Sequence, residues 1–238
     1  KSTDAGSDKQ LFSLIPPDKC NVHFNNLITE TPTEYIYTFN YIYNGAGVAI
    51  ADFDNDGLQD IYFTGNQVKD KLYKNKGDFK FEDVSASSGI EQYGGWHSGV
   101  ITADINNDGL MDVYICRGGY HNSPDNKNLL LINKGGMKFE DQAEKFGLAD
   151  PGYSVTATFI DYDGDGDLDL YVDNRPERWE IHEDSILAVK ERMEKKGIED
   201  PLVTDHFYRN NGDGTFTNIT KEAGFYPNYG YGLGVVAG

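Results

Sequence analysis

Hydrophobic and polar positions repeat along this chain in one unit that occurs three times. In each unit a short apolar stretch leads into a nine-residue acidic segment, and a second apolar stretch follows directly. The acidic segments are DFDNDGLQD at 52–60 (loop one), DINNDGLMD at 104–112 (loop two) and DYDGDGDLD at 161–169 (loop three). Two runs of alternating polarity around an Asn/Gly-rich turn come next, which is the pattern of a β-hairpin. Each unit therefore predicts four strands, and the acidic loop joins the first two.

The size of the repeat indicates the fold. The loops begin 52 and then 57 residues apart, and four-stranded units of about fifty residues are typical of propeller blades. We therefore predict an all-β fold, a partial β-propeller of four-stranded blades; a solenoid of such sheets is the alternative. Because propellers have about four to eight blades, three blades and one further strand cannot close a ring. We expect the chain to be the front part of a longer protein.

The repeat also sets the expected organisation of the chain. Blade three contains a long insertion with apolar residues at near-helical spacing, which predicts a surface helix at about 177–197. The run KSTDAGSDKQ is polar and has no initial Met, so we expect a tether left after removal of an upstream segment. The expected parts are a tether at 1–10, an N-terminal segment with a strand pairing with the propeller at 11–44, blade one at 45–98, blade two at 99–153, blade three at 154–229, and the first strand of a fourth blade at 230–238.

Charge and composition exclude several classes of partner. The chain has 39 acidic and 21 basic residues and a formal charge of -18, which repels nucleic-acid backbones and anionic membrane surfaces. We expect no nucleic-acid partner. No stretch approaches the roughly 20 apolar residues of a membrane span, so we expect no transmembrane segment. If the protein is attached to a membrane, we expect a lipid anchor upstream of residue 1. The two cysteines, Cys20 and Cys116, are expected to be buried free thiols, with a bridge between them as the alternative.

The acidic loops have the composition of a cation site. Oxygen-bearing side chains occupy positions 1, 3, 5 and 9, and glycine at position 6 permits the sharp bend. Hard oxygen donors without His or Cys favour Ca²⁺, and the backbone carbonyl of position 7 should complete the set. The candidate ligands are Asp52, Asp54, Asp56, Leu58 and Asp60 in loop one, Asp104, Asn106, Asp108, Leu110 and Asp112 in loop two, and Asp161, Asp163, Asp165, Asp167 and Asp169 in loop three.

An EF-hand and a plain turn are the two alternatives for these loops. An EF-hand needs a Glu at position 12, but that position holds Phe63, Ile115 and Val172. We therefore expect the bidentate ligand at position 9. Plain Asp/Asn/Gly turns are the other alternative, which three copies in register disfavour. We predict about three Ca²⁺ sites of chiefly structural role, weakest in loop two, where Asn106 removes one charge. Millimolar calcium is found outside the cytoplasm, so we expect an extracytoplasmic location, in the periplasm or at the cell surface.

The chain also resembles a known family. The loops and their surroundings resemble the FG-GAP or VCBS repeats of integrin-α-like β-propellers. VHFNNLITET, YNGAGVAIADFDNDGLQDIYFTGN and the recurring FxD followed by Ala-Gly-Phe or similar residues resemble the bacterial branch associated with UnbV and cartilage-acidic-protein-like proteins. The resemblance covers about residues 20–238. It implies calcium ligands at the four acidic positions and the loop carbonyl.

A mostly aromatic column predicts a ligand surface. Asn44, Trp96 and Tyr153 each lie eight residues before a loop, where the first strand of each blade begins. On inner strands they would surround the mouth of the central channel; the alternative is packing between blades. The candidate ligand-binding residues are Trp96, His97, Tyr153, Arg117 and Arg175.

The function we expect is a binding or scaffolding module for protein or glycan. We assign no catalytic residue in this chain. The alternative is the N-terminal part of a carbohydrate-active enzyme whose catalytic residues lie mostly beyond residue 238. The strand expected at 230–238 has an unpaired edge, so we also expect self-association through it.

Overall fold

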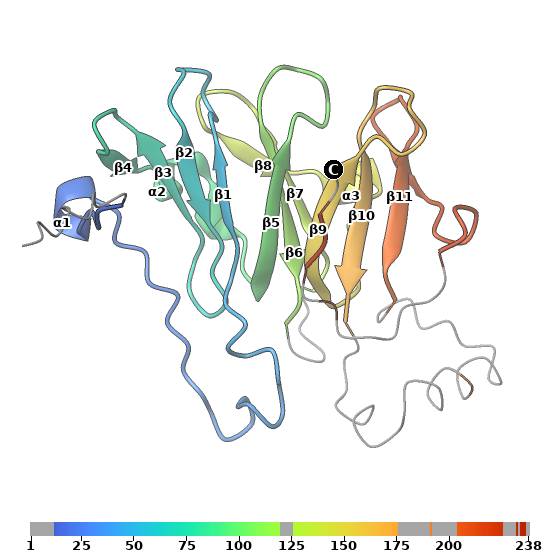
Figure 1. Cartoon of the computed structure of the whole chain (residues 1–238), viewed down its shortest axis with the longest axis horizontal. Coiled ribbons are helices and arrows are strands. Elements are labelled where there is room, and N and C mark those ends of the chain that lie inside the picture. The colour runs from blue at the N-terminus through green and yellow to red at the C-terminus, as the bar shows by residue number, and fades with distance from the viewer. Residues whose placement is uncertain are drawn as a thin grey trace, which may run out of the picture.

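Three antiparallel sheets form the body of the protein. The computed structural model describes residues 12–119, 126–175, 191, 204–225, 232 and 234–236. In this part of the chain the sheets stand side by side, each with its four strands in sequence order (Figure 1). Sheet one contains β1 (Val48–Ala51), β2 (Asp60–Phe63), β3 (Lys71–Asn75) and β4 (Phe81–Asp83); sheet two contains β5 (His97–Ala103), β6 (Asp112–Arg117), β7 (Leu129–Asn133) and β8 (Phe139–Asp141); sheet three contains β9 (Ser154–Ile160), β10 (Asp169–Asn174), β11 (His206–Asn210) and β12 (Phe216–Asn218).

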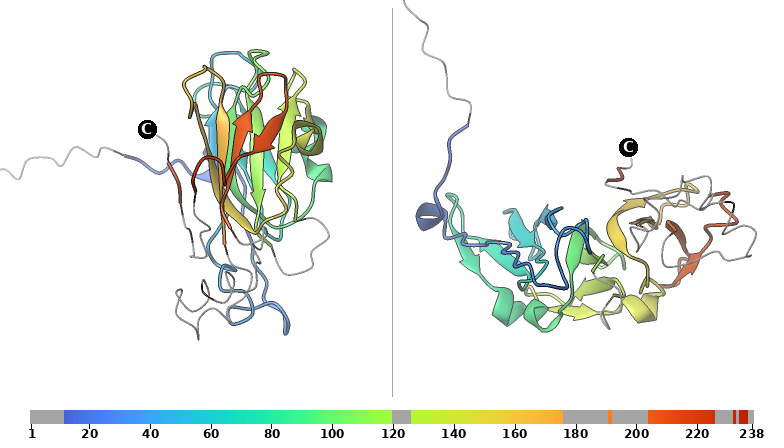
Figure 2. Two further views of the ribbon diagram at one scale, coloured as in Figure 1. Left: turned by 90° about the vertical axis from the view of Figure 1, so that its right-hand side faces the viewer. Right: turned by 90° about the horizontal axis from the view of Figure 1, so that it is seen from below.

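The arrangement is that of neighbouring propeller blades. The first strands are adjacent, since β5 contacts both β1 and β9, and the sheets follow one another in an open arc when seen from below (Figure 2). The predicted partial β-propeller is therefore confirmed, with an acidic loop between the first two strands of every sheet. Strand β5 begins at His97, two residues before the predicted start of blade two at residue 99.

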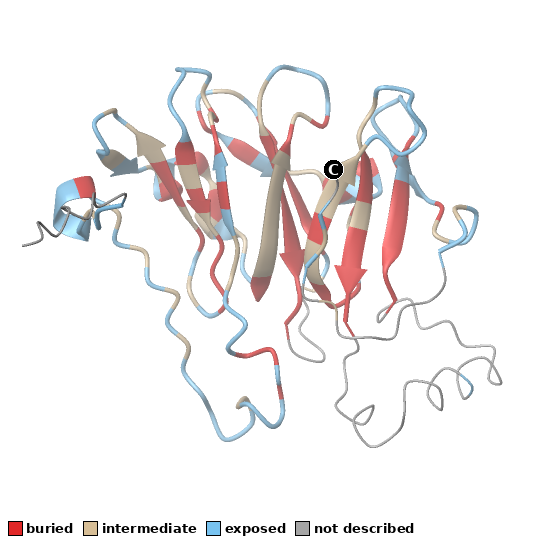
Figure 3. Ribbon diagram, in the orientation of Figure 1, coloured by how far each residue is buried: buried red, intermediate tan, exposed pale blue. Residues whose placement is uncertain are grey.

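The core lies between the sheets. In β6, Val113 and Ile115 pack toward sheet one, whereas Tyr114 and Cys116 pack toward sheet three. Because side chains alternate across a strand, a sheet between two others buries both faces. All residues of β6 and β7 are buried (Figure 3). The first strand of sheet one differs, since Val48 and Ile50 are exposed on its outer face.

Short helical turns connect one sheet to the next. α2 (Ser85–Ser88) and η1 (Ile90–Gln92) follow sheet one, and α3 (Ala143–Phe146) follows sheet two. α3 ends at Gly147, which has φ 77°. A Cβ at Gly147 would lie 2.8 Å from the carbonyl oxygen of Phe216, so sheet three can approach this turn only if the residue is glycine.

The strand expected in the N-terminal segment, 11–44, is not found in the part of it that the structure describes. Residues 12–47 contain α1 (Pro17–Cys20) and turns, and the first strand begins at Val48. The segment crosses the outer face of sheet one instead of following a strand edge, so no backbone ladder can form. Its contacts are made by side chains: Asn21 donates to the Phe81 carbonyl (2.9 Å), and Phe24 stacks on Phe63 with ring centroids 4.9 Å apart.

The last part of this segment turns beneath the first strands. Phe39, Tyr41 and Ile42 form a small core with Trp96. Cys20 and Cys116 are free, buried thiols. The helix expected at 177–197 lies outside the described residues except for Glu191, and most of the strand expected at 230–238 lies outside them too. Among the described helices, none combines the length and hydrophobicity needed to cross a bilayer.

Candidate metal-binding loops

The three acidic loops lie at the same end of the strands, each between the first two strands of its sheet (Figure 1). Loops one and two touch, because Asn55 donates to the carbonyl of Gly109 (2.9 Å). Each loop has positive φ at positions 4 and 6, a backbone conformation that glycine and asparagine tolerate. The residues are Asn55 (57°), Asn107 (56°) and Gly164 (76°) at position 4, and Gly57 (84°), Gly109 (84°) and Gly166 (94°) at position 6. The backbone bend that we expected at the glycine is present in all three loops.

The carboxylate at position 1 organises the loop that it begins. Asp52 accepts hydrogen bonds from the backbone N–H groups of Asp56 (3.1 Å) and Gly57 (2.8 Å). Asp104 and Asp161 accept two such bonds each, at 2.8–3.2 Å, from their own loops. These bonds hold the position-1 carboxylate against the bend and leave further lone pairs for a cation.

The aspartate at position 9 ties each loop to its sheet. Asp60 accepts one backbone N–H from Phe53 (3.0 Å) and one from Asn75 at the end of β3 (2.7 Å). Asp112 and Asp169 repeat both bonds at 2.8–3.1 Å. All three are buried, and burial raises their pKa, to about 6 for Asp112. Since both oxygens already accept a hydrogen bond, position 9 is a structural clamp whether or not it also holds an ion.

Loops one and three gather their carboxylates. Oxygens of Asp52, Asp54 and Asp60 lie within 4.8 Å of one another, and those of Asp161, Asp163 and Asp169 do the same. The position-5 carboxylates, Asp56 and Asp165, are not part of these groups. Loop two forms no such group among the described residues. In loop two, position 3 is Asn106 instead of an aspartate, and its side-chain amide donates a hydrogen bond to Asp108 (2.9 Å).

The donor set fits a hard divalent cation. Within the described structure, Asp54 Oδ1 is buried and has no hydrogen-bond partner. A buried carboxylate oxygen without a donor is costly, and several carboxylates in one loop repel one another. A cation bound by oxygens alone would pair with the buried oxygen and reduce the repulsion among the carboxylates. Calcium tolerates the irregular coordination geometry of such a loop. The Leu58, Leu110 and Asp167 carbonyls remain predicted ligands.

The aromatic column lies at the opposite end of the first strands from the acidic loops, and most of its residues are buried. Trp96, His97, Tyr153, Arg117 and Arg175 are all less than 9% exposed. The Arg175 guanidinium lies over the rings of Phe39, Tyr41 and Tyr153, at 4.9–5.2 Å from their centres. It also donates to the carbonyls of Gly118 (2.6 Å) and Gly119 (3.0 Å). These contacts favour the packing alternative over direct ligand contact.

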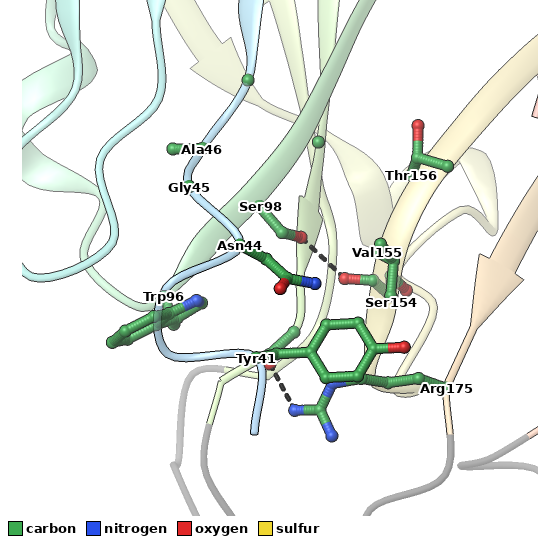
Figure 4. Close-up of a pocket in the computed structure, with 13 residues that line it drawn as sticks. Tyr41, Asn44, Gly45, Ala46, Trp96, Ser98, Ser154, Val155, Thr156 and Arg175 are labelled. Atoms are coloured by element: carbon green, nitrogen blue, oxygen red, sulfur yellow. Dashed lines mark hydrogen bonds between the residues drawn. The ribbon is translucent and has the colours of Figure 1, made fainter. Parts of the chain in front are cut away.

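A cavity of about 420 Å³ nevertheless opens at this end, between the N-terminal segment and the first strands (Figure 4). Trp96 and Arg175 line it together with Asn44, Ser98 and Thr156. Tyr153, His97 and Arg117 are not among its lining residues. Two of the five candidate residues therefore border a space that a ligand can enter.

A hydrogen-bond network that the sequence did not predict joins the sheets. Tyr62 donates to Asp70 (2.8 Å), and Asp70 pairs with His97 of sheet two (2.8 Å). In the next unit, Asn128 donates to the Tyr114 hydroxyl (3.0 Å) and to Ser154 of sheet three (2.8 Å). The available signal was the tyrosine two residues after every position-9 aspartate.

Comparison with known proteins places these loops in a described repeat. A family model described as FG-GAP-like repeat matches residues 52–115 and 119–172. Cartilage acidic protein 1 of Xenopus tropicalis is 31% identical over 131 residues, which is 55% of this chain and 20% of that protein. The Homo sapiens protein of the same name is 30% identical over 131 residues, 55% of this chain and 19% of its own length. Integrin alpha-8 of Gallus gallus is 26% identical over 147 residues, 54% of this chain and 14% of that protein. The chain thus spans about a fifth or less of the curated relatives it matches.

Proposed function

Since the chain belongs to the proteins that carry FG-GAP-like repeats, we propose that it is a binding module of the β-propeller type, stabilised by calcium and located outside the cytoplasm. The observation that carries the proposal is one loop geometry, repeated in three adjacent sheets, with grouped carboxylates in loops one and three. Plain turns need no grouped carboxylates, so the repetition supports a cation.

Calcium in this proposal has a structural role. The ligands would be the side chains at positions 1, 3, 5 and 9 with the carbonyl at position 7, and the ion would supply the positive charge that the carboxylates lack. A site at calcium one hundred times its dissociation constant adds about 2.7 kcal/mol to the stability of the folded state. Three sites are therefore comparable to the net stability of a whole domain.

The partner we propose is a protein or a glycan. The charge of -18 opposes nucleic acid. The cavity at the opposite end from the loops, with aromatic, amide and hydroxyl groups in its lining, supports a polar ligand. Calcium would act on binding indirectly, by fixing the sheets whose first strands form that cavity.

Thermal unfolding tests the calcium proposal. The protein is melted in 1 mM CaCl₂, in 1 mM MgCl₂ and in chelator, at one ionic strength. For a chain of this size each kcal/mol shifts the melting temperature by roughly 2–4 °C, so three calcium sites should raise it by more than about 10 °C. Magnesium should have a much smaller effect. Equal melting temperatures in calcium and chelator would contradict the proposal.

A further inference from the structure

A lysine from the sheet already binds two candidate ligands of loop one. Lys74 lies in β3, and its Nζ donates to Asp54 Oδ2 and to Asp56 Oδ2, the latter at 3.1 Å. The lysine side chain is 21% exposed and that of Asp54 is 15% exposed, so the pair is largely shielded from water. Shielded ion pairs are screened less than surface pairs.

The equivalent position differs in the other two units. Lys74 pairs with Glu82 of β4 in the strand register, as Ile132 pairs with Glu140 in sheet two and Arg209 with Thr217 in sheet three. Ile132 is buried in the core. Arg209 is exposed and makes no ion pair with the described residues. Of the three loops, only loop one therefore has a cationic side chain from this strand position on its carboxylates.

An ammonium group and a calcium ion need the same oxygens. The lysine supplies one positive charge to loop one, where calcium would supply two. Calcium can bind there only if Lys74 withdraws from Asp54 and Asp56, or remains nearby as a like charge, and both cost affinity. In chelator the same lysine reduces repulsion among the four carboxylates of the loop.

We infer that Lys74 is a built-in counter-cation of loop one, which keeps this loop folded when calcium is scarce and lowers its calcium affinity below that of loop three. The inference rests on the calcium function proposed above. It also changes the order of calcium affinities expected from composition, in which loop two alone is the weakest. With Lys74 bound, the net charge of loop one falls to that of loop two, which has Asn106 in place of an aspartate.

Calcium titration of Lys74→Met tests the inference. The chain is freed of metal by chelator, dialysed, and titrated by calorimetry, and its melting temperature is measured in chelator. We expect one site of Lys74→Met to bind calcium about 10-fold more tightly than in the wild type, since the competing charge is gone. In chelator the variant should melt at a lower temperature, because the loop has lost its counter-charge.

Two charge-matched variants serve as controls. Arg209→Met removes the cation at the equivalent strand position of sheet three, and Lys127→Met removes one that pairs with Glu144 away from the loops. Both should leave the affinity of loop one unchanged. Lys74→Gln, which keeps a hydrogen-bond donor without the charge, replaces Lys74→Met if the latter fails to fold in chelator.

The outcomes separate the two proposals. Tighter calcium binding together with a lower melting temperature in chelator supports the counter-cation. Unchanged affinity and melting temperature in Lys74→Met overturn it while calcium still binds the wild type, and weaker binding also overturns it, because the lysine would then position the ligands. If the wild type binds no calcium, the calcium function proposed above is wrong. In that case the two control variants should bind no calcium either.

Discussion

In each acidic loop the backbone bends at two residues, at positions 4 and 6, that have the left-handed conformation. At position 6 all three residues are glycine, and no atom lies within 4 Å of the place that a Cβ of Gly57, Gly109 or Gly166 would take. Backbone conformation, and not space, therefore requires the glycine. At position 4 asparagine serves in two loops, because its short polar side chain tolerates this conformation better than most residues do.

Gly57→Ala tests this account of the bend. The substitution should lower the free energy of unfolding by about 1–2 kcal/mol, because alanine is strained at a φ of 84°. Gly94→Ala is the matched control, since Gly94 is also exposed with open space around it but lacks the positive φ. Urea unfolding in excess calcium measures both. Equal effects of the two substitutions would contradict the strain argument.

A second residue-scale feature is a buried pair of carboxyl groups. Asp173 is 4% exposed, and its Oδ2 has no hydrogen-bond partner among the described residues. Burial, followed by the charge of Asp205 and a hydrogen bond to it, raises the pKa of Asp173 to about 7. A carboxyl whose pKa is raised on folding favours the folded state most below its unfolded pKa of about 4, and this advantage is lost as pH rises through 7.

The protein should therefore be more stable at pH 6 than at pH 8. Asp173→Asn should remove most of this difference and raise stability at pH 8 by about 1–3 kcal/mol, because the amide carries no charge to repel Asp205. Glu222→Gln, an exposed change of the same kind, should leave the difference intact. Urea unfolding at both pH values, with calcium in excess, decides the matter; a wild type of equal stability at pH 6 and pH 8 would refute it.

At the scale of elements, the strands could be predicted from the sequence, but the path of the N-terminal segment over sheet one could not. β6 and β7 contain uninterrupted apolar runs, Val113–Cys116 and Leu129–Ile132, because both faces of sheet two are buried, and the hairpin turns carry Asn and Gly. The N-terminal segment has no such pattern. It is held by side-chain contacts far apart in sequence, such as Phe24 on Phe63, and local patterns do not encode those. The predicted strand there was wrong for that reason.

Arg175 fastens this segment to the sheets. Its guanidinium lies over Phe39 and Tyr41 of the segment while it donates to Gly118 and Gly119 beyond β6. A lysine cannot reproduce the planar stacking and the paired hydrogen bonds. Arg175→Lys should therefore lower the free energy of unfolding by about 1–3 kcal/mol and speed proteolysis within residues 12–46.

Arg209→Lys, on an exposed position, is the control for this substitution. Urea unfolding and limited proteolysis are measured on both variants. If Arg175→Lys were as stable and as resistant to protease as the control, Arg175 would not fasten the segment, and its role as a ligand-binding residue would be favoured instead.

At the scale of the whole molecule, the acidic loops lie at one end of the strands in all three sheets (Figure 1), and the cavity lies at the opposite end of the first strands. The repeat was enough to predict the three sheets, the position of each loop and the open arc, because every unit carries the same pattern. It did not reveal the clamp at position 9 or the ion pair of Lys74, since both depend on strands that meet only in the folded chain. The loops thus combine predicted ligands with contacts that only the fold supplies.

The number of calcium ions bound per folded chain tests the central claim most directly. Equilibrium dialysis against ⁴⁵Ca²⁺, after removal of metal by chelator, should find three ions per wild-type chain. It should find two in the variant that combines Asp161→Asn with Asp163→Asn, because loop three loses two of the four carboxylates at positions 1, 3, 5 and 9. A chain that is folded at millimolar calcium and binds no ion would contradict the account.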